Sequence, residues 1–212
     1  MVSLIKQIKS LQKSHINNKI EQRIEEFKSF KNKSQDKWYS ELCFCILAAN
    51  SKQKTSEAIQ RQLGARGFLT KNQKQLSQII LKNKHRFHNN KAKYLIELRA
   101  HPNIKHTITQ QLRDRGIIKT REWLVNNVKG IGYKEASHFL RNTGTTSLAI
   151  LDRHILNVMK EHNIIDEIPK LMNRNNYLEI EKKFYKLSGQ LNMSPAKLDL
   201  FMWYMKTGEV AK

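Results

Sequence analysis

The sequence predicts an all-α protein built from about eight to twelve helices of ordinary length. Apolar residues recur at spacings of three and four along much of the 212-residue chain, as one face of a helix requires. Three prolines leave long stretches uninterrupted, and no run alternates apolar and polar residues as a half-buried strand does. Because 39% of the residues are hydrophobic, the chain can bury a core and is not a disordered polymer.

The first helices are amphipathic, and a buried helix follows them. Ile16, Ile20 and Ile24 keep a four-residue spacing, which predicts one apolar face. The solid apolar run LCFCILAA holds both cysteines, Cys43 and Cys45, with one residue between them. This spacing matches neither a zinc site nor a redox pair, so we expect buried, reduced thiols and no metal cluster held by cysteine.

Two basic segments in the first half are predicted to be loops. They are GARGF at 64–68 and NKHRFHNNKAKY at 83–94. In the second segment, Arg86 and Phe87 pair a phosphate ligand with a ring that can stack on a base. An ordinary solvated turn explains either segment equally simply, so both readings stay open.

The net charge of +21, from 39 basic and 18 acidic residues, favours a polyanionic partner, with nucleic acid first. A ribosome-associated or simply basic protein is the alternative. No apolar run approaches the roughly 20 residues of a membrane span, and the first residues lack the apolar core of a secretory signal. We therefore expect a cytoplasmic, nucleoid-associated monomer with no membrane partner.

The run NNVKGIGYKEA predicts a tight turn between two helices. Val128 and Ile131 can pack inward, while Gly130 and Gly132 permit the turn. If a helix begins at Tyr133, its first N–H groups form a phosphate site supported by the helix dipole. This is the helix–hairpin–helix pattern, a sequence-independent clamp on a DNA backbone. An ordinary helix–helix turn is the alternative.

An amine and a carboxylate follow this turn. Lys134 comes directly after the hairpin, and Asp152 lies 18 residues later in LDRHIL. Asp-x-His before an apolar run predicts a helix N-cap. If the helices joined by NTGTTS fold back, the carboxylate and the amine face one cavity. In the simpler alternative, Asp152 only caps a helix and Lys134 only contacts phosphate.

The last helix is predicted within SPAKLDLFMWYMKTG. Ser194 and Pro195 form a start signal and Gly208 a stop signal. Trp203 lies on this helix and is interpreted either as a core residue or as a ring that stacks on a base.

Together, VKGIGYKEASHFL and LAILDRHIL resemble the helix–hairpin–helix superfamily of DNA glycosylases. The resemblance implies that Lys134 is the catalytic amine and Asp152 the catalytic carboxylate. The endonuclease III and adenine glycosylase branches carry a four-cysteine iron–sulfur motif that this sequence lacks, so no iron–sulfur cofactor is expected. The runs ELCFCILAANSKQ and HRFHNNKAKY, with the ending GEVAK, are similar to the archaeal type 2 branch of 8-oxoguanine DNA glycosylases.

The resemblance also implies an architecture and an activity. Residues 1–212 would form one glycosylase domain of two helical subdomains flanking a DNA-binding cleft, with the hairpin at about 120–141. The substrate would be double-stranded DNA containing 8-oxoguanine, and the activity that of a bifunctional glycosylase and AP lyase of base excision repair. Lys134 would displace the base and form a Schiff base with the sugar, and β-elimination would then nick the strand.

Further site residues follow from the same resemblance. The terminal carboxylate of Lys212 would lie close to the damaged base, Trp203 would stack on it, and Phe87 is a weaker candidate for a second ring wall. No side chain is expected to hold a metal. In this superfamily the hairpin carbonyls can hold a monovalent cation, which here would be those of Asn126, Val128 and Ile131.

Two alternatives remain open at the level of sequence. The chain could be a non-catalytic helix–hairpin–helix DNA-binding module, or a glycosylase for an oxidised pyrimidine or an alkylated purine.

Overall fold

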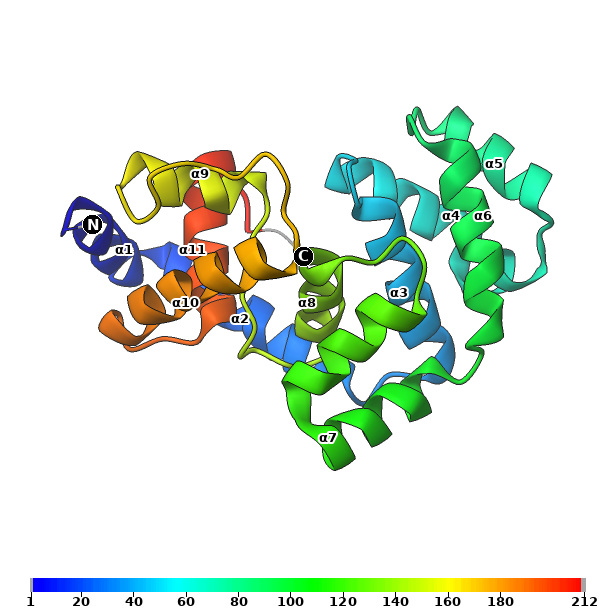
Figure 1. Ribbon diagram of the computed structural model, residues 1–212, viewed down its shortest axis with the longest axis horizontal. Coiled ribbons are helices and arrows are strands. Elements are labelled where there is room, and N and C mark those ends of the chain that lie inside the picture. The colour runs from blue at the N-terminus through cyan, green and yellow to red at the C-terminus, as the bar shows by residue number, and fades with distance from the viewer. Residues whose placement is uncertain (1, 211–212) are drawn as a thin grey trace. The chain divides into compact units, whose positions relative to one another are not determined.

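The computed structural model describes residues 2–210, and its regular elements over that range are eleven α-helices and one short 3-10 helix. The predicted all-α class is therefore confirmed (Figure 1). The chain divides into two compact units, one formed by Met1–Lys31 with Leu140–Lys212 and the other by Asn32–Phe139. Within residues 2–210, no helix is both long and apolar enough to cross a membrane.

The unit Asn32–Phe139 is built around α3 (Gln35–Ala48), which packs against α4, α6 and α7. Every residue of α3 from Trp38 to its end is buried, including the free thiols of Cys43 and Cys45, as predicted. The other elements of the unit are α4 (Gln53–Thr70), α5 (Gln73–Lys82), α6 (His88–Glu97), the 3-10 helix Leu98–Ala100, α7 (Ile104–Asn127) and most of α8 (Tyr133–Asn142).

The prediction of a loop at 64–68 is wrong, because this segment lies inside α4. Gly64 leaves helical geometry there, with φ 55° and ψ −176°, and the helix resumes after it. A glycine can adopt this conformation at little steric cost, so Gly64 breaks the helix at one residue and two helical stretches meet there at a kink. The second predicted loop is partly right, since residues 83–87 separate α5 from α6 but the rest of that segment is helical.

The other unit is built around α11 (Pro195–Thr207), which packs against α1, α2, α9 and α10. Figure 1 shows α9 and α11 side by side. Ser194 caps the start of α11 and Gly208 ends it in the left-handed region, as predicted. The remaining helices are α1 (Val2–Gln12), α2 (His15–Phe30), α9 (Arg153–Glu161) and α10 (Arg174–Gln190).

A buried ion pair stabilises this second unit. Arg141, near the end of α8, pairs with Asp199 of α11, and each side chain is only 4% exposed. The guanidinium carbon of Arg141 also lies 4.7 Å from the centre of the Phe27 ring. Phe27 belongs to the buried face of α2 that the four-residue spacing predicted.

Candidate active site

The predicted hairpin is present between α7, which ends at Asn127, and α8, which begins at Tyr133. Val128 and Ile131 are buried, with 3% and 6% of their surface exposed. The N–H of Ile131 donates to the carbonyl of Val128 at 3.3 Å, which closes the turn. Inward packing of these two apolar side chains fixes the turn between the helices.

Gly130 is required at the tip of this hairpin for two reasons. Its φ is +81°, a conformation that residues with a Cβ rarely adopt. A Cβ at this position would also lie 2.5 Å from a ring carbon of Tyr94, which α6 presses against the turn. The glycine therefore allows the hairpin both its shape and its close approach to α6.

Lys134 lies in the first turn of α8, with its side chain 25% exposed. Its Nζ is 3.6 Å from Oε1 of Glu135, and Oε2 of Glu135 accepts a hydrogen bond from the N–H of Gly132 at 3.2 Å. This second contact is the reach-back half of a capping box. Glu135 therefore accepts a hydrogen bond from the N–H of Gly132, one of the hairpin groups that were predicted to contact phosphate. The Gly-x-x-Glu spacing at the helix start could have revealed it.

A second lysine, Lys91 of α6, lies close enough to interact electrostatically with Lys134 and Glu135. Lys91 is 5% exposed, and its Nζ donates to the carbonyl of Ile46 at 2.6 Å, at the C-terminal end of α3. Burial, the largest cause, lowers the pKa of Lys91 from 10.5 to about 8. The Glu135 carboxylate opposes this shift and the charge of Lys134 adds to it. Lys91 was not predicted as a site residue, because nothing in the local sequence indicates its burial.

The loop before α6 is held by a histidine. His85 is buried, contacts the carbonyl of Leu47 through Nε2 at 2.9 Å and accepts from the N–H of Phe87 through Nδ1 at 3.2 Å. Burial is the largest cause that lowers the pKa of His85, which favours the neutral ring these two contacts require. Phe87 itself is 41% exposed, and Arg86 stacks over it at 5.4 Å. An aromatic ring held outward in this way is available for stacking.

Asp152 caps α9 as predicted, since its Oδ1 accepts from the N–H of Ile155 at 2.9 Å. Tyr177 of α10 fixes the backbone just before this cap. Its hydroxyl donates to the carbonyl of Ala149 at 2.8 Å and accepts from the N–H of Leu151 at 3.4 Å. Asp152 is half-buried, so it is not a core residue.

Trp203 is half-buried on α11. Its ring meets the ring of His154 edge to face, with the centres 4.7 Å apart. Because His154 lies in the first turn of α9, Trp203 is held beside the helix that Asp152 caps. The Trp203 ring is therefore neither a fully buried core residue nor a free surface residue.

The proposed cation ligands lie at the C-terminal end of α7 and in the turn. Asn126 belongs to the last turn of α7, where helix carbonyls lack intrahelical partners, and the carbonyl of Val128 accepts one hydrogen bond, from Ile131. Backbone carbonyl oxygens of this kind can coordinate a hard monovalent cation. Among the described residues, no group of three His, Cys, Asp or Glu side chains could hold a metal. Lys212 lies outside the described residues.

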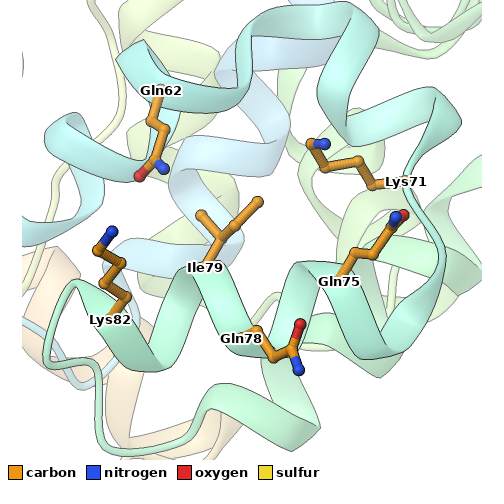
Figure 2. Close-up of a pocket in the computed structure, with 6 residues that line it drawn as sticks. All are labelled: Gln62, Lys71, Gln75, Gln78, Ile79 and Lys82. Atoms are coloured by element: carbon orange, nitrogen blue, oxygen red, sulfur yellow. The ribbon is translucent and has the colours of Figure 1, made fainter.

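Figure 2 shows a hollow of about 260 Å³ that contains none of the predicted site residues. Ile79 lies at its centre and polar side chains surround it. It is therefore separate from the candidate active site. The lining residues are Gln62, Lys71, Gln75, Gln78, Ile79 and Lys82.

The predicted residues thus fall into two sets. Lys134, the hairpin and Phe87 belong to the unit Asn32–Phe139, whereas Asp152 and Trp203 belong to the other unit. The approach of the Asp152 carboxylate to the Lys134 amine stays a prediction.

The chain is similar in sequence to known proteins over nearly its full length. Residues 20–193 match the family model described as 8-oxoguanine DNA glycosylase. The chain belongs to the 8-oxoguanine DNA glycosylase family. It is 47% identical over 209 residues to the 8-oxoguanine DNA glycosylase/AP lyase of Methanocaldococcus jannaschii, covering 99% of each chain.

Solved structures of the family have the same fold. The M. jannaschii 8-oxoguanine glycosylase/lyase in complex with a 15mer DNA containing 8-oxoguanine matches with a TM-score of 0.94 at 46% identity, over 99% of this chain and 100% of that one. The 8-oxoguanine DNA glycosylase of Thermotoga maritima matches with a TM-score of 0.90 at 36% identity, over 99% of each chain. The family resemblance found in the sequence is therefore confirmed.

Proposed function

We propose that this chain is a bifunctional DNA glycosylase and AP lyase that removes 8-oxoguanine from double-stranded DNA in base excision repair. The observation that carries the proposal is Lys134, a partly exposed amine in the first turn of the helix that follows the hairpin. The family relatives named 8-oxoguanine DNA glycosylase/AP lyase, which the chain matches over nearly its full length, support the substrate. We further propose that the two units act together as one glycosylase domain, as a monomer, at the nucleoid.

The reaction begins when the target base leaves the stack. The lone pair of the Lys134 amine then forms a bond to the sugar C1′, while the electron pair of the bond from C1′ to the base leaves with the base. Loss of a proton and opening of the sugar give a Schiff base, and β-elimination of the 3′ phosphate nicks the strand. Asp152 stabilises the positive charge that develops at C1′ and assists proton transfer.

The hairpin residues Gly130, Ile131 and Gly132 hold the backbone of the DNA strand in this proposal. The N–H groups of Ile131 and Gly132 already bond to the Val128 carbonyl and the Glu135 carboxylate, so the remaining N–H groups of the turn and of the first turn of α8 contact phosphate. A monovalent cation at the carbonyls of Asn126 and Val128, together with Ile131, would add positive charge at the same place. The net charge of +21 makes binding steeply dependent on salt.

Trp203 stacks on the extruded base, the carboxylate of Lys212 reads its N7–H, and Phe87 forms a second ring wall. The support for Trp203 is its half-exposed position beside the helix that Asp152 caps. Residues appended after Lys212 should then weaken excision of 8-oxoguanine and spare the lyase reaction on abasic sites. Equal loss of both activities would exclude the terminus from base recognition.

No iron–sulfur cluster takes part, because the two cysteines cannot supply four thiolate ligands.

Borohydride trapping tests the proposal. Wild-type protein should form a covalent adduct with a duplex containing 8-oxoguanine, and Lys134→Gln should form none. A folded wild-type protein that binds DNA but neither releases a base nor gives an adduct on any lesion would be a non-catalytic binding module. A panel of duplexes with oxidised pyrimidines and alkylated purines identifies the lesion.

A second variant separates the two functions of Asp152. Asparagine caps a helix about as well as aspartate, so Asp152→Asn should change the free energy of unfolding by less than about 0.5 kcal/mol. It should nevertheless slow base excision by about a hundredfold or more, because the charge that stabilises C1′ is lost. If Asp152→Asn excises the base at the wild-type rate, Asp152 only caps α9 and has no catalytic role.

A further inference from the structure

Glu135 has two contacts at the start of α8, and a helix cap explains only one of them. Its Oε2 accepts the N–H of Gly132 at 3.2 Å, whereas its Oε1 lies 3.6 Å from the Nζ of Lys134. The side chain is only 15% exposed, so water screens this second contact less than it would screen a surface ion pair. The carboxylate therefore acts on the lysine amine as well as on the hairpin.

A negative charge at this place is unfavourable for DNA binding. The helix start and the hairpin are where a phosphate would bind, and a carboxylate there repels phosphate. A glutamine would complete the same capping contact without the charge. The helix dipole favours a carboxylate at a helix start, so the observation that indicates a function for the charge is its contact with the Lys134 amine.

The second charged neighbour shows what this function is. Lys91 is buried on α6 and interacts electrostatically with both Glu135 and Lys134. Its ammonium opposes any positive charge on the Lys134 nitrogen. That nitrogen becomes positive when the amine attacks C1′, loses this charge with a proton, and becomes positive again when the sugar opens to the protonated Schiff base. Glu135 is placed to offset Lys91 and to stabilise this charge.

We propose that Glu135 is a positioning residue for the nucleophile Lys134. Its carboxylate, anchored to the hairpin, orients the Lys134 amine and stabilises the positive charge that forms on the amine nitrogen. This inference rests on the proposed function, because it needs Lys134 to be the nucleophile. Since Glu135 acts on the amine and not on the base, base excision and the lyase reaction on abasic sites should depend on it equally.

Two substitutions separate the cap from the charge. Glu135→Gln keeps an oxygen for the N–H of Gly132 and removes the charge, whereas Glu135→Ala removes both. Glu97→Gln is the matched control, because it removes one carboxylate from the exposed surface of α6, where Glu97 faces Lys93 at 3.9 Å. Single-turnover excision of 8-oxoguanine, borohydride trapping on abasic-site duplex, and affinity for a duplex with a non-cleavable abasic analogue are measured for each protein.

With Glu135→Gln we expect the rate of single-turnover excision and the rate of adduct formation on the abasic-site duplex each to fall by about tenfold or more, since one charged contact to the reacting nitrogen is lost. Affinity for the duplex should be unchanged or higher, because a charge that repels phosphate is gone. Glu97→Gln should match the wild type in both rates.

The opposite results overturn the inference. If Glu135→Gln reacts at the wild-type rate while Glu135→Ala is slow, Glu135 only caps the helix. If Glu135→Gln loses rate and affinity in parallel, its effect is on DNA binding. Absence of any adduct with wild-type protein would instead remove the proposed function, and this inference with it.

Discussion

The buried ammonium of Lys91 makes the stability of this protein depend on pH in a way that can be calculated. The pKa of Lys91 falls from 10.5 to about 8 in the folded protein, first because of burial. Below the pKa that Lys91 has in the folded protein, Lys91 is protonated in both the folded and the unfolded chain. Burial of its charge then lowers the free energy of unfolding by the full amount. Between the two values the unfolded chain binds more protons, so the free energy of unfolding rises with pH. The contribution of Lys91 is fully present above 10.5 and is lost as the pH falls through about 8.

The magnitude follows from the size of the shift. One pKa unit corresponds to about 1.4 kcal/mol, and a rise from about pH 7 to about pH 9.5 spans some 1.5 units above the folded value. The free energy of unfolding of the wild type, minus that of Lys91→Met, should therefore increase by about 2 kcal/mol across this range.

Urea denaturation of both proteins at the two pH values measures this difference. Lys93→Met is the matched control, because Lys93 lies on the same helix with its side chain 64% exposed. Its difference from the wild type should not change by more than about 0.5 kcal/mol. If the difference in free energy of unfolding between the wild type and Lys91→Met is equally independent of pH, burial of the Lys91 ammonium does not lower the stability of the folded protein.

Three further substitutions test the framework around the site. Asp199→Asn should lower the free energy of unfolding by about 3–5 kcal/mol, because it removes a carboxylate that pairs with the buried Arg141 guanidinium; a loss below about 1 kcal/mol in urea would contradict this. Gly130→Ala should weaken DNA binding, and combining it with Tyr94→Ala should restore part of the affinity, since the steric contact is removed but the positive φ remains. Tyr177→Phe should cost about 1–3 kcal/mol through two lost backbone contacts and slow single-turnover excision, whereas an unchanged rate would show that Asp152 is held without it.

The local features of the site were predictable because they are set by neighbouring residues. The tight turn from Val128 to Gly132, the helix start at Tyr133 and the Asp152 cap each depend on a few consecutive side chains and on backbone geometry. Their outcomes agree with the sequence analysis. The segment 64–68 did not follow its pattern, because Gly64 alone leaves helical geometry and the residues after it are helical again.

The sequence by itself determined the helical class, the hairpin, the charge and the Asp152 cap. It did so because periodicity, turn residues and caps act over a few residues at a time. The tertiary structure alone decided the surroundings of these groups. Lys91 and Lys134 are 43 positions apart in the chain, and only the packing of α6 brings the first lysine near the second. Burial and electrostatic environment depend on such distant contacts, and the buried lysine beside the Glu135 carboxylate is therefore visible only in the folded protein.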